Sequence, residues 1–205
     1  MESYTTIEHS AKFEYEDRKS VFIGEAIPVS TEGDALAFIA HIKKKYPDAR
    51  HHVYAYVLRE NSTMRFSDDR EPQGTAGMPV LDVIRKSGCT DVAIVVVRYF
   101  GGILLGTGGL VRAYTGAASG ALHAANVITY DVYSELEIRV SYSDYQKILL
   151  PLEELGFRCV DTKFSDNVLL IGKIKAAETL GFCEKITEIT SGRCEIGVLG
   201  EKFDF

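Results

Sequence analysis

The sequence AIVVVRYFGGILLGTGGLVR, residues 93–112, joins a short apolar run to a glycine-rich segment. Ala93–Val97 is β-branched, has the length of a strand and is bounded by turn residues, which predicts a buried central strand. Leu110–Ala125 is a run of small residues with helical character, and Asn126 can take the left-handed conformation that ends a helix. The stretch therefore predicts a strand, a glycine loop and a helix in direct succession.

The loop contains five glycines: Gly101, Gly102, Gly106, Gly108 and Gly109. Glycines before a helix let backbone amides approach an anion, and the helix N-terminus adds a partial positive charge. The common phosphate-binding patterns are not met, because Thr107-Gly108 replaces the Lys-Ser/Thr of a P-loop and Val111 replaces the last glycine of GxGxxG. Two interpretations remain open: a tight turn with close helix–strand packing, or an anion or nucleic-acid backbone site formed with Arg98 and Arg112.

The residues before this stretch predict an α+β arrangement. Three strands are expected: Phe13–Pro28, His52–Arg59 and Met64–Phe66. Two helices are expected beside them. The first is capped at Thr31 and stopped by Pro47, and the second has Pro79 in its first turn and ends at Gly88.

A different pattern follows a seam at Asn126–Ser134. Alternation over Leu136–Val140 predicts a half-buried strand, and Ser143-Asp144-Tyr145-Gln146 matches the capping box of a helix that ends at Gly156. Three further elements are expected: a hairpin of Phe157–Phe164 with Val168–Ile174, a helix over Ala176–Ile189 and a strand over Arg193–Leu199. The order βαββαβ is the ferredoxin-like pattern, so we expect an N-terminal domain over 1–133 and a C-terminal domain over 134–205.

A second cluster that could bind a ligand or carry out chemistry is acidic. It consists of Ser67, Asp68, Asp69 and Glu71. Three carboxylates in four residues could bind Mg²⁺ or act as an acid/base pair. No histidine, serine nucleophile or cysteine stands at a telling spacing beside them, and Pro72 and Gly74 mark a loop. The cluster is therefore a partner-binding loop or a possible metal loop, and its metal is unknown.

Two other polar positions are candidates for a binding surface. His51 and His52 open a strand, where adjacent side chains point to opposite faces, so the two cannot ligate one metal ion without irregular backbone. His51 remains a polar site candidate. Lys19 lies in the short basic loop Arg18-Lys19-Ser20, which precedes an apolar strand segment.

Composition excludes several classes of protein. The chain has 205 residues and a net charge of −6, which argues against binding of nucleic acid by bulk charge. Apolar runs such as Val92–Val97 are far shorter than the roughly 20 residues of a membrane span. The start Met1–Thr5 shows no signal-peptide pattern, and the four cysteines show no CxxC spacing. We therefore expect a cytoplasmic protein with no cofactor and no membrane contact.

Four segments together resemble the IMPACT family: RYFGGILLGTGGLVRAY (98–114), SDDREPQGTAGMP (67–79), HHVYAY (51–56) and RKSVFIG (18–24). The chain looks most like the bacterial two-domain branch, the YigZ-like proteins, and the resemblance covers essentially the whole chain. One position departs from the family, which usually reads Asp-Asp-Gly-Glu-Pro where this chain carries Arg70 as the third residue.

The resemblance implies an N-terminal domain similar to the second domain of a small-subunit ribosomal protein and to domain IV of elongation factor G. It implies a C-terminal domain similar to domain V of that factor. Eukaryotic relatives act in translational control, where they compete for the activator of a starvation-responsive initiation-factor kinase. No reaction is securely tied to the family.

The leading hypothesis is a non-enzymatic, translation-associated regulatory protein that binds RNA, the ribosome or a protein partner in translational control. Its candidate anion or nucleic-acid site comprises Arg98, Tyr99, Gly101, Gly102, Gly106, Gly108, Gly109, Arg112, Lys19 and His51. If Arg98 and Arg112 face a ligand, truncating either should leave folding nearly intact. The alternatives are a metal-dependent phosphate-handling or hydrolytic enzyme that uses Asp68–Glu71, and a pure protein–protein adaptor. The oligomeric state is left open.

Overall fold

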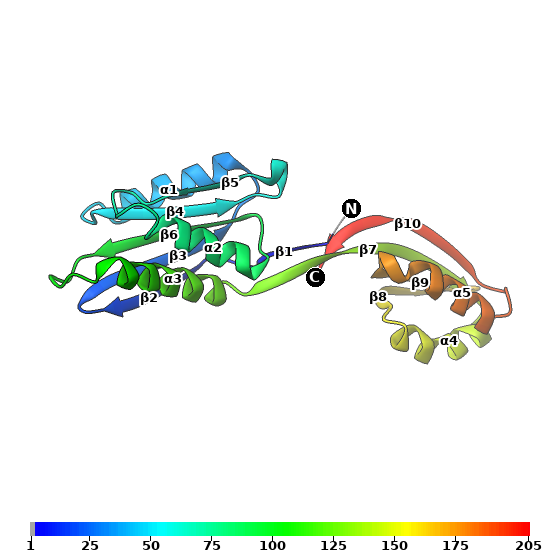
Figure 1. Cartoon of the computed structure of the whole chain (residues 1–205). Coiled ribbons are helices and arrows are strands. Elements are labelled where there is room, and N and C mark those ends of the chain that lie inside the picture. Colours follow the sequence, from blue (N-terminus) through cyan, green and yellow to red (C-terminus); the bar gives the residue numbers. More distant parts are fainter. Residues whose placement is uncertain (1–2) are drawn as a thin grey trace. The chain divides into compact units, whose positions relative to one another are not determined.

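The computed structural model describes residues 3–205, which form two compact units (Figure 1). One unit comprises Tyr4–Thr129, and the other comprises Tyr130–Phe205 together with Ser3. The division falls inside a continuous strand, β7 (Val127–Val140), a few residues before the boundary expected between 133 and 134. The expected seam is therefore extended β-structure and not a loop.

The first unit is built on a five-stranded sheet in which every neighbouring pair is antiparallel. Its strand order is β2 (Ala11–Asp17), β3 (Ser20–Pro28), β6 (Val92–Tyr99), β4 (His51–Val57) and β5 (Met64–Ser67). A short strand, β1 (Tyr4–Ile7), lies beside the start of β7, where the hydroxyls of Thr5 and Thr129 are 3.0 Å apart. A single 3₁₀ turn, Glu60–Ser62, connects β4 to β5.

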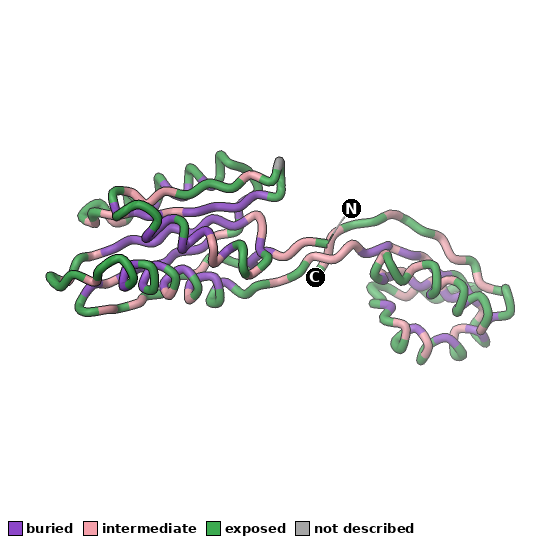
Figure 2. The backbone as a smooth tube through the Cα atoms, viewed as in Figure 1, coloured by how far each residue is buried: buried purple, intermediate pink, exposed green. Residues whose placement is uncertain are grey.

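Helices cover both faces of this sheet. Helix α1 (Glu32–Lys45) packs on one face, and helices α2 (Gly77–Ser87) and α3 (Gly106–Ala124) pack on the other. Strand β6 is central, and its residues alternate between the two cores, so that the whole run from 92 to 98 is buried (Figure 2). A strand buried on both faces reads as an unbroken apolar run, which explains why the sequence of β6 is so distinct.

The second unit contains β7, α4 (Tyr142–Glu154), β8 (Arg158–Phe164), β9 (Val168–Lys175), α5 (Thr179–Ile189) and β10 (Glu195–Asp204), with a 3₁₀ turn at Ala176–Glu178. This is the strand–helix–strand–strand–helix–strand order expected from the sequence. The antiparallel sheet has the order β10-β7-β9-β8. Its apolar residues form one cluster with α4 and α5, including Leu136, Ile148 and Phe182.

Three expected boundaries are corrected. Phe13–Pro28 is not one strand but the hairpin β2–β3, because Arg18 and Lys19 take left-handed backbone conformations (φ 47° and 66°) that form its two-residue turn. Helix α3 begins at Gly106 and not at Leu110. The cap of α4 is Ser141, whose hydroxyl accepts from the Asp144 amide, and not Ser143.

None of the helices within residues 3–205 combines the length and the apolarity that crossing a membrane requires.

Candidate functional site

The glycine loop runs from the end of β6 to the start of α3 and lies against the turn between β2 and β3. A Cβ atom on Gly101 would fall 2.1 Å from the carbonyl carbon and oxygen of Lys19, so only glycine fits there. The Gly101 amide also donates to the Ser20 hydroxyl at 3.1 Å. The segments 18–24 and 98–114, which are far apart in the sequence, thus meet at one end of the unit.

The N-terminus of α3 is open to solvent. Leu105 precedes the helix and makes no side-chain cap hydrogen bond, and the first turn of the helix carries no acidic residue. Gly106, Thr107 and Gly108 are exposed. Because the first amides of a helix have no internal acceptor and lie at the positive end of its dipole, this end presents hydrogen-bond donors suited to an anion.

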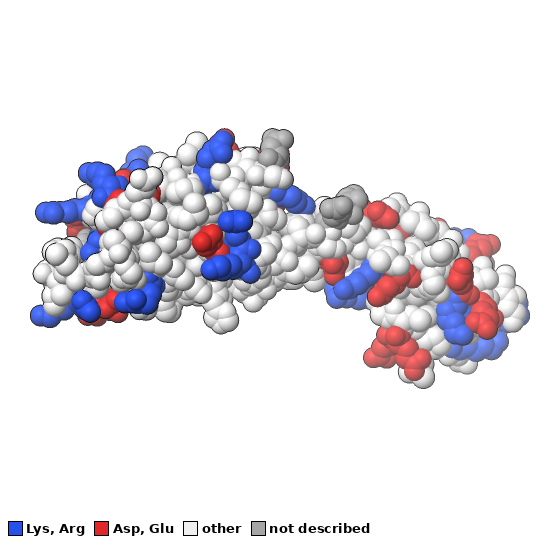
Figure 3. Space-filling model, in the orientation of Figure 1, with Lys and Arg blue, Asp and Glu red and all other residues white. Residues whose placement is uncertain are grey.

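Three exposed cations border the loop. Arg18 donates from Nη1 to the Leu104 carbonyl at 3.4 Å, and Lys19 is its neighbour in the same turn. Nη1 of Arg112 lies 3.8 Å from the place that a Cβ on Gly108 would take. Figure 3 shows Lys and Arg side chains at the end of the unit where the β6–α3 loop lies in Figure 1. Exposed cations therefore border the free helix end, although acidic side chains also lie at this end of the unit.

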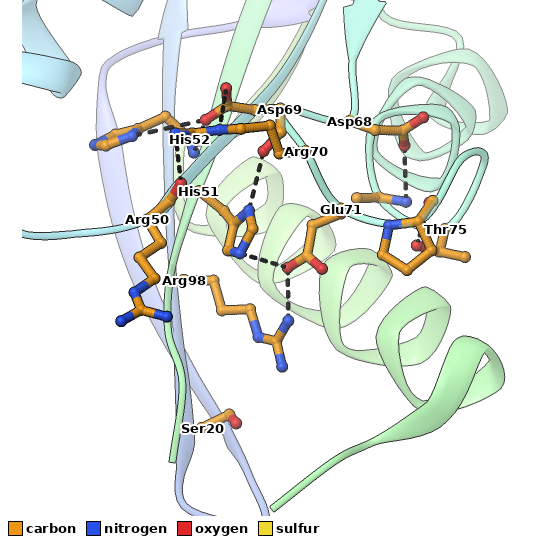
Figure 4. Close-up of polar contacts among 12 residues, drawn as sticks. Ser20, Arg50, His51, His52, Asp68, Asp69, Arg70, Glu71, Thr75 and Arg98 are labelled. Carbon is orange, nitrogen blue, oxygen red and sulfur yellow. Dashed lines mark hydrogen bonds and ion pairs between the residues drawn. The ribbon is translucent and has the colours of Figure 1, made fainter. Parts of the chain in front are cut away.

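A buried polar cluster lies in the interior, beside the loop (Figure 4). Nη1 of Arg98 donates to Oε1 of Glu71 at 2.7 Å, and the Tyr114 hydroxyl donates to the same oxygen at 2.7 Å. Nε2 of His51 is 3.9 Å from that oxygen. Burial, with the Glu71 carboxylate as a second cause, raises the pKa of Tyr114 far above its ordinary value, so the phenol stays protonated and donates.

The cluster corrects the expected placement of two residues. Arg98 is only 7% exposed, because its side chain points to the face of β6 that α2 and α3 cover. Tyr99 points to the opposite face, as strand alternation requires, and its hydroxyl donates to Asp48 at 2.9 Å. Arg98 is thus an interior residue, Tyr99 lies apart from it, and of the two arginines only Arg112 is exposed.

The carboxylates of the acidic loop point to separate partners. Asp68 accepts from the amides of Gly74, Ala76 and Gly77 at 2.9, 3.1 and 2.8 Å, and it thereby caps α2. Asp69 accepts from the His52 amide at 2.7 Å, and its own amide donates to Ser67. Among residues 3–205, no three His, Cys, Asp or Glu side chains are grouped to hold a metal ion.

Arg70 lies in a left-handed conformation with φ 71°, next to Asp69 with φ 39°. Its guanidinium reaches back to the Arg50 carbonyl at 2.9 Å. The position that usually carries glycine in the resemblance described above therefore requires left-handed backbone here as well, although its side chain is arginine.

The glycines of the loop differ in what they require. Gly102 and Gly106 have φ of 85° and 71°, which favours glycine strongly. Gly108 and Gly109 lie inside helix α3, and the obstacle at Gly109 is a contact of 2.9 Å between an added Cβ and the Cβ of Leu105.

Sequence reasoning missed Tyr114 and Ser20 as members of the region. The one signal for Tyr114 was that it is a large polar residue in a helix of small ones.

Comparison with known proteins settles the family. Residues 18–122 match the Impact N-terminal domain. The IMPACT family member YvyE of Bacillus subtilis is 38% identical over 197 residues, which are 96% of this chain and 91% of that protein. The chain belongs to the IMPACT family. Residues 138–193 also match a second family model, a domain of unknown function named DUF1949.

Other relatives match different shares of the chain. YigZ of Escherichia coli is 34% identical over 91% of this chain and 93% of its own length. Protein IMPACT of Bos taurus is 33% identical over 94 residues, which are 44% of this chain and 30% of that protein. A solved structure titled as a hypothetical protein has a TM-score of 0.61 and 32% identity, and the match covers 98% of both chains.

Proposed function

We propose that this IMPACT family protein is a translation-associated regulator that binds RNA, without a catalytic step, at the surface formed by the β6–α3 loop and the β2–β3 turn. The observation that carries the proposal is the exposed N-terminus of α3, which Leu105 does not cap, with Arg18, Lys19 and Arg112 around it. Free amides and exposed cations are the groups that contact phosphates in nucleic-acid complexes.

The net charge of −6 limits binding by charge alone. Affinity must then come from a few well-placed contacts, and it should fall with salt in proportion to the small number of phosphates neutralised. Ribosomal RNA fits the proposal in the same way as free RNA. The resemblance to translational-control proteins supports this choice over other anionic ligands.

We also propose the domain types that the resemblance implies. The sheet order β10-β7-β9-β8 with both helices in one core supports a ferredoxin-like unit similar to domain V of elongation factor G. A similarity of the first unit to the second domain of a small-subunit ribosomal protein, and to domain IV of that factor, is part of the same proposal.

A protein partner is the second candidate, and one feature of the loop favours it. Phe100, Ile103 and Leu104 are 52%, 43% and 80% exposed at its tip, and exposed apolar side chains next to each other mark interaction surfaces. The hydrolytic alternative has no such support, because Asp68, Asp69 and Glu71 are each engaged by different groups of the fold.

Crosslinking in cells tests the two candidates together. Ultraviolet crosslinking, with sequencing of bound RNA and recovery of co-purifying proteins, is compared for the wild type and the double variant Lys19→Ala/Arg112→Ala. We expect RNA attached to peptides from residues 98–112 and a clear loss of RNA in the variant. Arg85→Ala, an exposed cation on α2, is the matched control. Recovery of a stable protein partner without crosslinked RNA would select the adaptor and contradict the proposal.

A further inference from the structure

One edge of the buried Arg98 guanidinium has no partner. Nη1 donates to Glu71, but Nε is buried and makes no hydrogen bond to any residue from 3 to 205. A guanidinium presents its donors as planar forks, and a fork of two N–H groups matches two oxygens of a carboxylate or phosphate. A buried charged donor left unpaired is costly, so it calls for a partner.

Glu71 contacts Arg98 at Nη1 and not at Nε. Its Oε1 accepts from both Arg98 and Tyr114, and Nε2 of His51 stands 3.9 Å away. The carboxylate therefore holds the guanidinium by a single nitrogen. This arrangement fixes the orientation of Arg98 and leaves the edge that contains Nε unused.

A second unused donor lies on the same face of the sheet. Arg98 pairs with Phe22 across β6 and β3, and Ser20 precedes Phe22 by two residues, which places Ser20 diagonally opposite Arg98. In Figure 4 the guanidinium lies between Glu71 and Ser20. The Ser20 oxygen accepts from the Gly101 amide, and within the described part of the chain its O–H has no acceptor.

Aromatic rings cover the guanidinium. The centroids of the Phe22 and Phe100 rings are each 5.5 Å from its central carbon. Phe22 is fully buried, whereas Phe100 is 52% exposed and is therefore the cover on the solvent side. Phe100 belongs to the glycine loop, so a ligand that reaches Arg98 from solvent on this side passes this side chain.

We propose that the free Nε edge of Arg98, with the Ser20 hydroxyl, binds a phosphate group. Glu71 neutralises the charge of Arg98, so this edge supplies directed hydrogen bonds while the exposed cations of the loop supply attraction. If the phosphate belongs to RNA, the inference rests on the proposed function. A free phosphate ion offers the same oxygens, and a buried water molecule is the competing partner of Nε.

The side-chain Nε–H signal of Arg98 in a nitrogen–proton correlation spectrum tests this directly, with the signal assigned by its loss in Arg98→Lys. Inorganic phosphate is titrated into the full chain at constant ionic strength, with chloride as the balancing ion. We expect a saturable shift with phosphate and none with chloride. Arg98→Lys keeps a positive charge beside Glu71 but loses the fork, so phosphate should bind roughly tenfold more weakly, as followed by the backbone amide signals of the glycine loop.

Two further variants protect the test against misfolding. Ser20→Ala leaves the Arg98–Glu71 pair in place and should also weaken phosphate binding. Arg85→Lys makes the same arginine-to-lysine change at an exposed site and should leave phosphate binding unchanged. An unmoved Nε–H signal at saturating phosphate would overturn the inference. A titration with single-stranded RNA separates the two proposals. If RNA binds but neither RNA nor phosphate shifts this signal, the inference alone is refuted. A shift with phosphate and no RNA binding refutes the RNA proposal alone.

Discussion

The Arg98–Glu71 pair joins two residues whose side chains are 8% and 3% exposed. Removing charges from water is costly, and the attraction between them repays that cost only while both partners are present. Tyr114 adds a neutral donor to the same carboxylate, so the pair holds together a strand, a loop and a helix. The first role of this cluster is therefore to stabilise the fold.

Truncation of either partner tests that role. Arg98→Ala or Glu71→Ala leaves an uncompensated buried charge, and each should lower the free energy of unfolding by about 3–5 kcal/mol. Arg112→Ala, at an exposed position, should change it by less than about 0.5 kcal/mol. Urea unfolding followed by circular dichroism measures all three. Equal, small effects at residues 98 and 112 would show that Arg98 is not held by Glu71 in solution.

Arg70 offers a second test at the scale of one residue. A left-handed conformation costs an arginine about 1–2 kcal/mol, and glycine removes that cost while it adds freedom to the unfolded chain. Arg70→Gly should therefore raise the free energy of unfolding by about 0.5–1 kcal/mol. The hydrogen bond lost from Arg70 to the Arg50 carbonyl is exposed and contributes little. A lower thermal midpoint for Arg70→Gly would mean that this bond outweighs the backbone strain.

At the scale of elements, the N-terminus of α4 is tied to the turn between α5 and β10. Arg193 donates to both oxygens of the buried Asp144 at 2.9 and 3.0 Å, and Lys147 donates to Oδ1. These hydrogen bonds, first those of Arg193 and then that of Lys147, hold the pKa of Asp144 well below its usual range. A carboxyl whose folded pKa is depressed stabilises the fold above its unfolded pKa, and this contribution is lost as the pH falls toward the folded value.

Asp144→Asn should expose this dependence. At pH 7 the variant should melt at a lower temperature than the wild type, because the fork of Arg193 loses its charged acceptor. Below about pH 4, the unfolded pKa of aspartate, the gap between the two melting temperatures should narrow as the wild-type carboxylate is protonated. A gap that stays constant from neutral to acid pH would contradict the assignment. Lys185→Ala, which breaks only an exposed pair with Glu188, is the control.

The elements that were predictable from sequence are those with local signals. Four features rest on neighbouring residues: the cap at Thr31, the left-handed Gly88 after α2, the left-handed Asn126 after α3 and the apolar run of β6. The loop at Arg18-Lys19-Ser20 was recognisable, but not that it is a tight hairpin turn, because Arg18 and Lys19 are unusual in left-handed positions. Ser143 was chosen as a cap because it stands at a valid spacing, but Ser141 occupies that role.

The candidate site was less predictable for a physical reason. The pairing of Arg98 with Glu71 joins residues 27 positions apart, and no local pattern in one sequence reports such a contact. The glycine loop was recognisable. The reason that glycine is needed at Gly101 and Gly109 was not, because it lies in the packing of Lys19 and Leu105 against these two positions. RNA binding by the exposed part of the site is predicted from the sequence and stays a prediction.

At the scale of the whole molecule, the second unit includes more of β7 than the sequence suggested. Residues 131–133 of β7 pair with residues 202–204 of β10. Tyr133 is 2% exposed, and the guanidinium of Arg158 lies 4.9 Å from its ring. These contacts belong to the unit but precede the boundary expected at residue 134.

Two fragments test the extent of the unit. A fragment of residues 130–205 should fold alone and melt cooperatively, although a unit of this size is marginal without other support. A fragment of residues 134–205 lacks Tyr133 and the partners of the last β10 residues, so it should melt at a lower temperature. Identical melts would show that the added strand contributes nothing, and a random-coil spectrum for both would contradict an independent unit.

The salt dependence of RNA binding tests the central claim most directly. Fluorescence anisotropy with a single-stranded RNA at several salt concentrations gives the slope of log affinity against log salt for the wild type and for Lys19→Ala/Arg112→Ala. Each phosphate contact on a single strand contributes about 0.7 to that slope, so loss of two contacts should reduce its magnitude by about 1.4 and weaken binding across sequences. A folded double variant that binds RNA with the wild-type affinity and slope would contradict an RNA site at the β6–α3 loop.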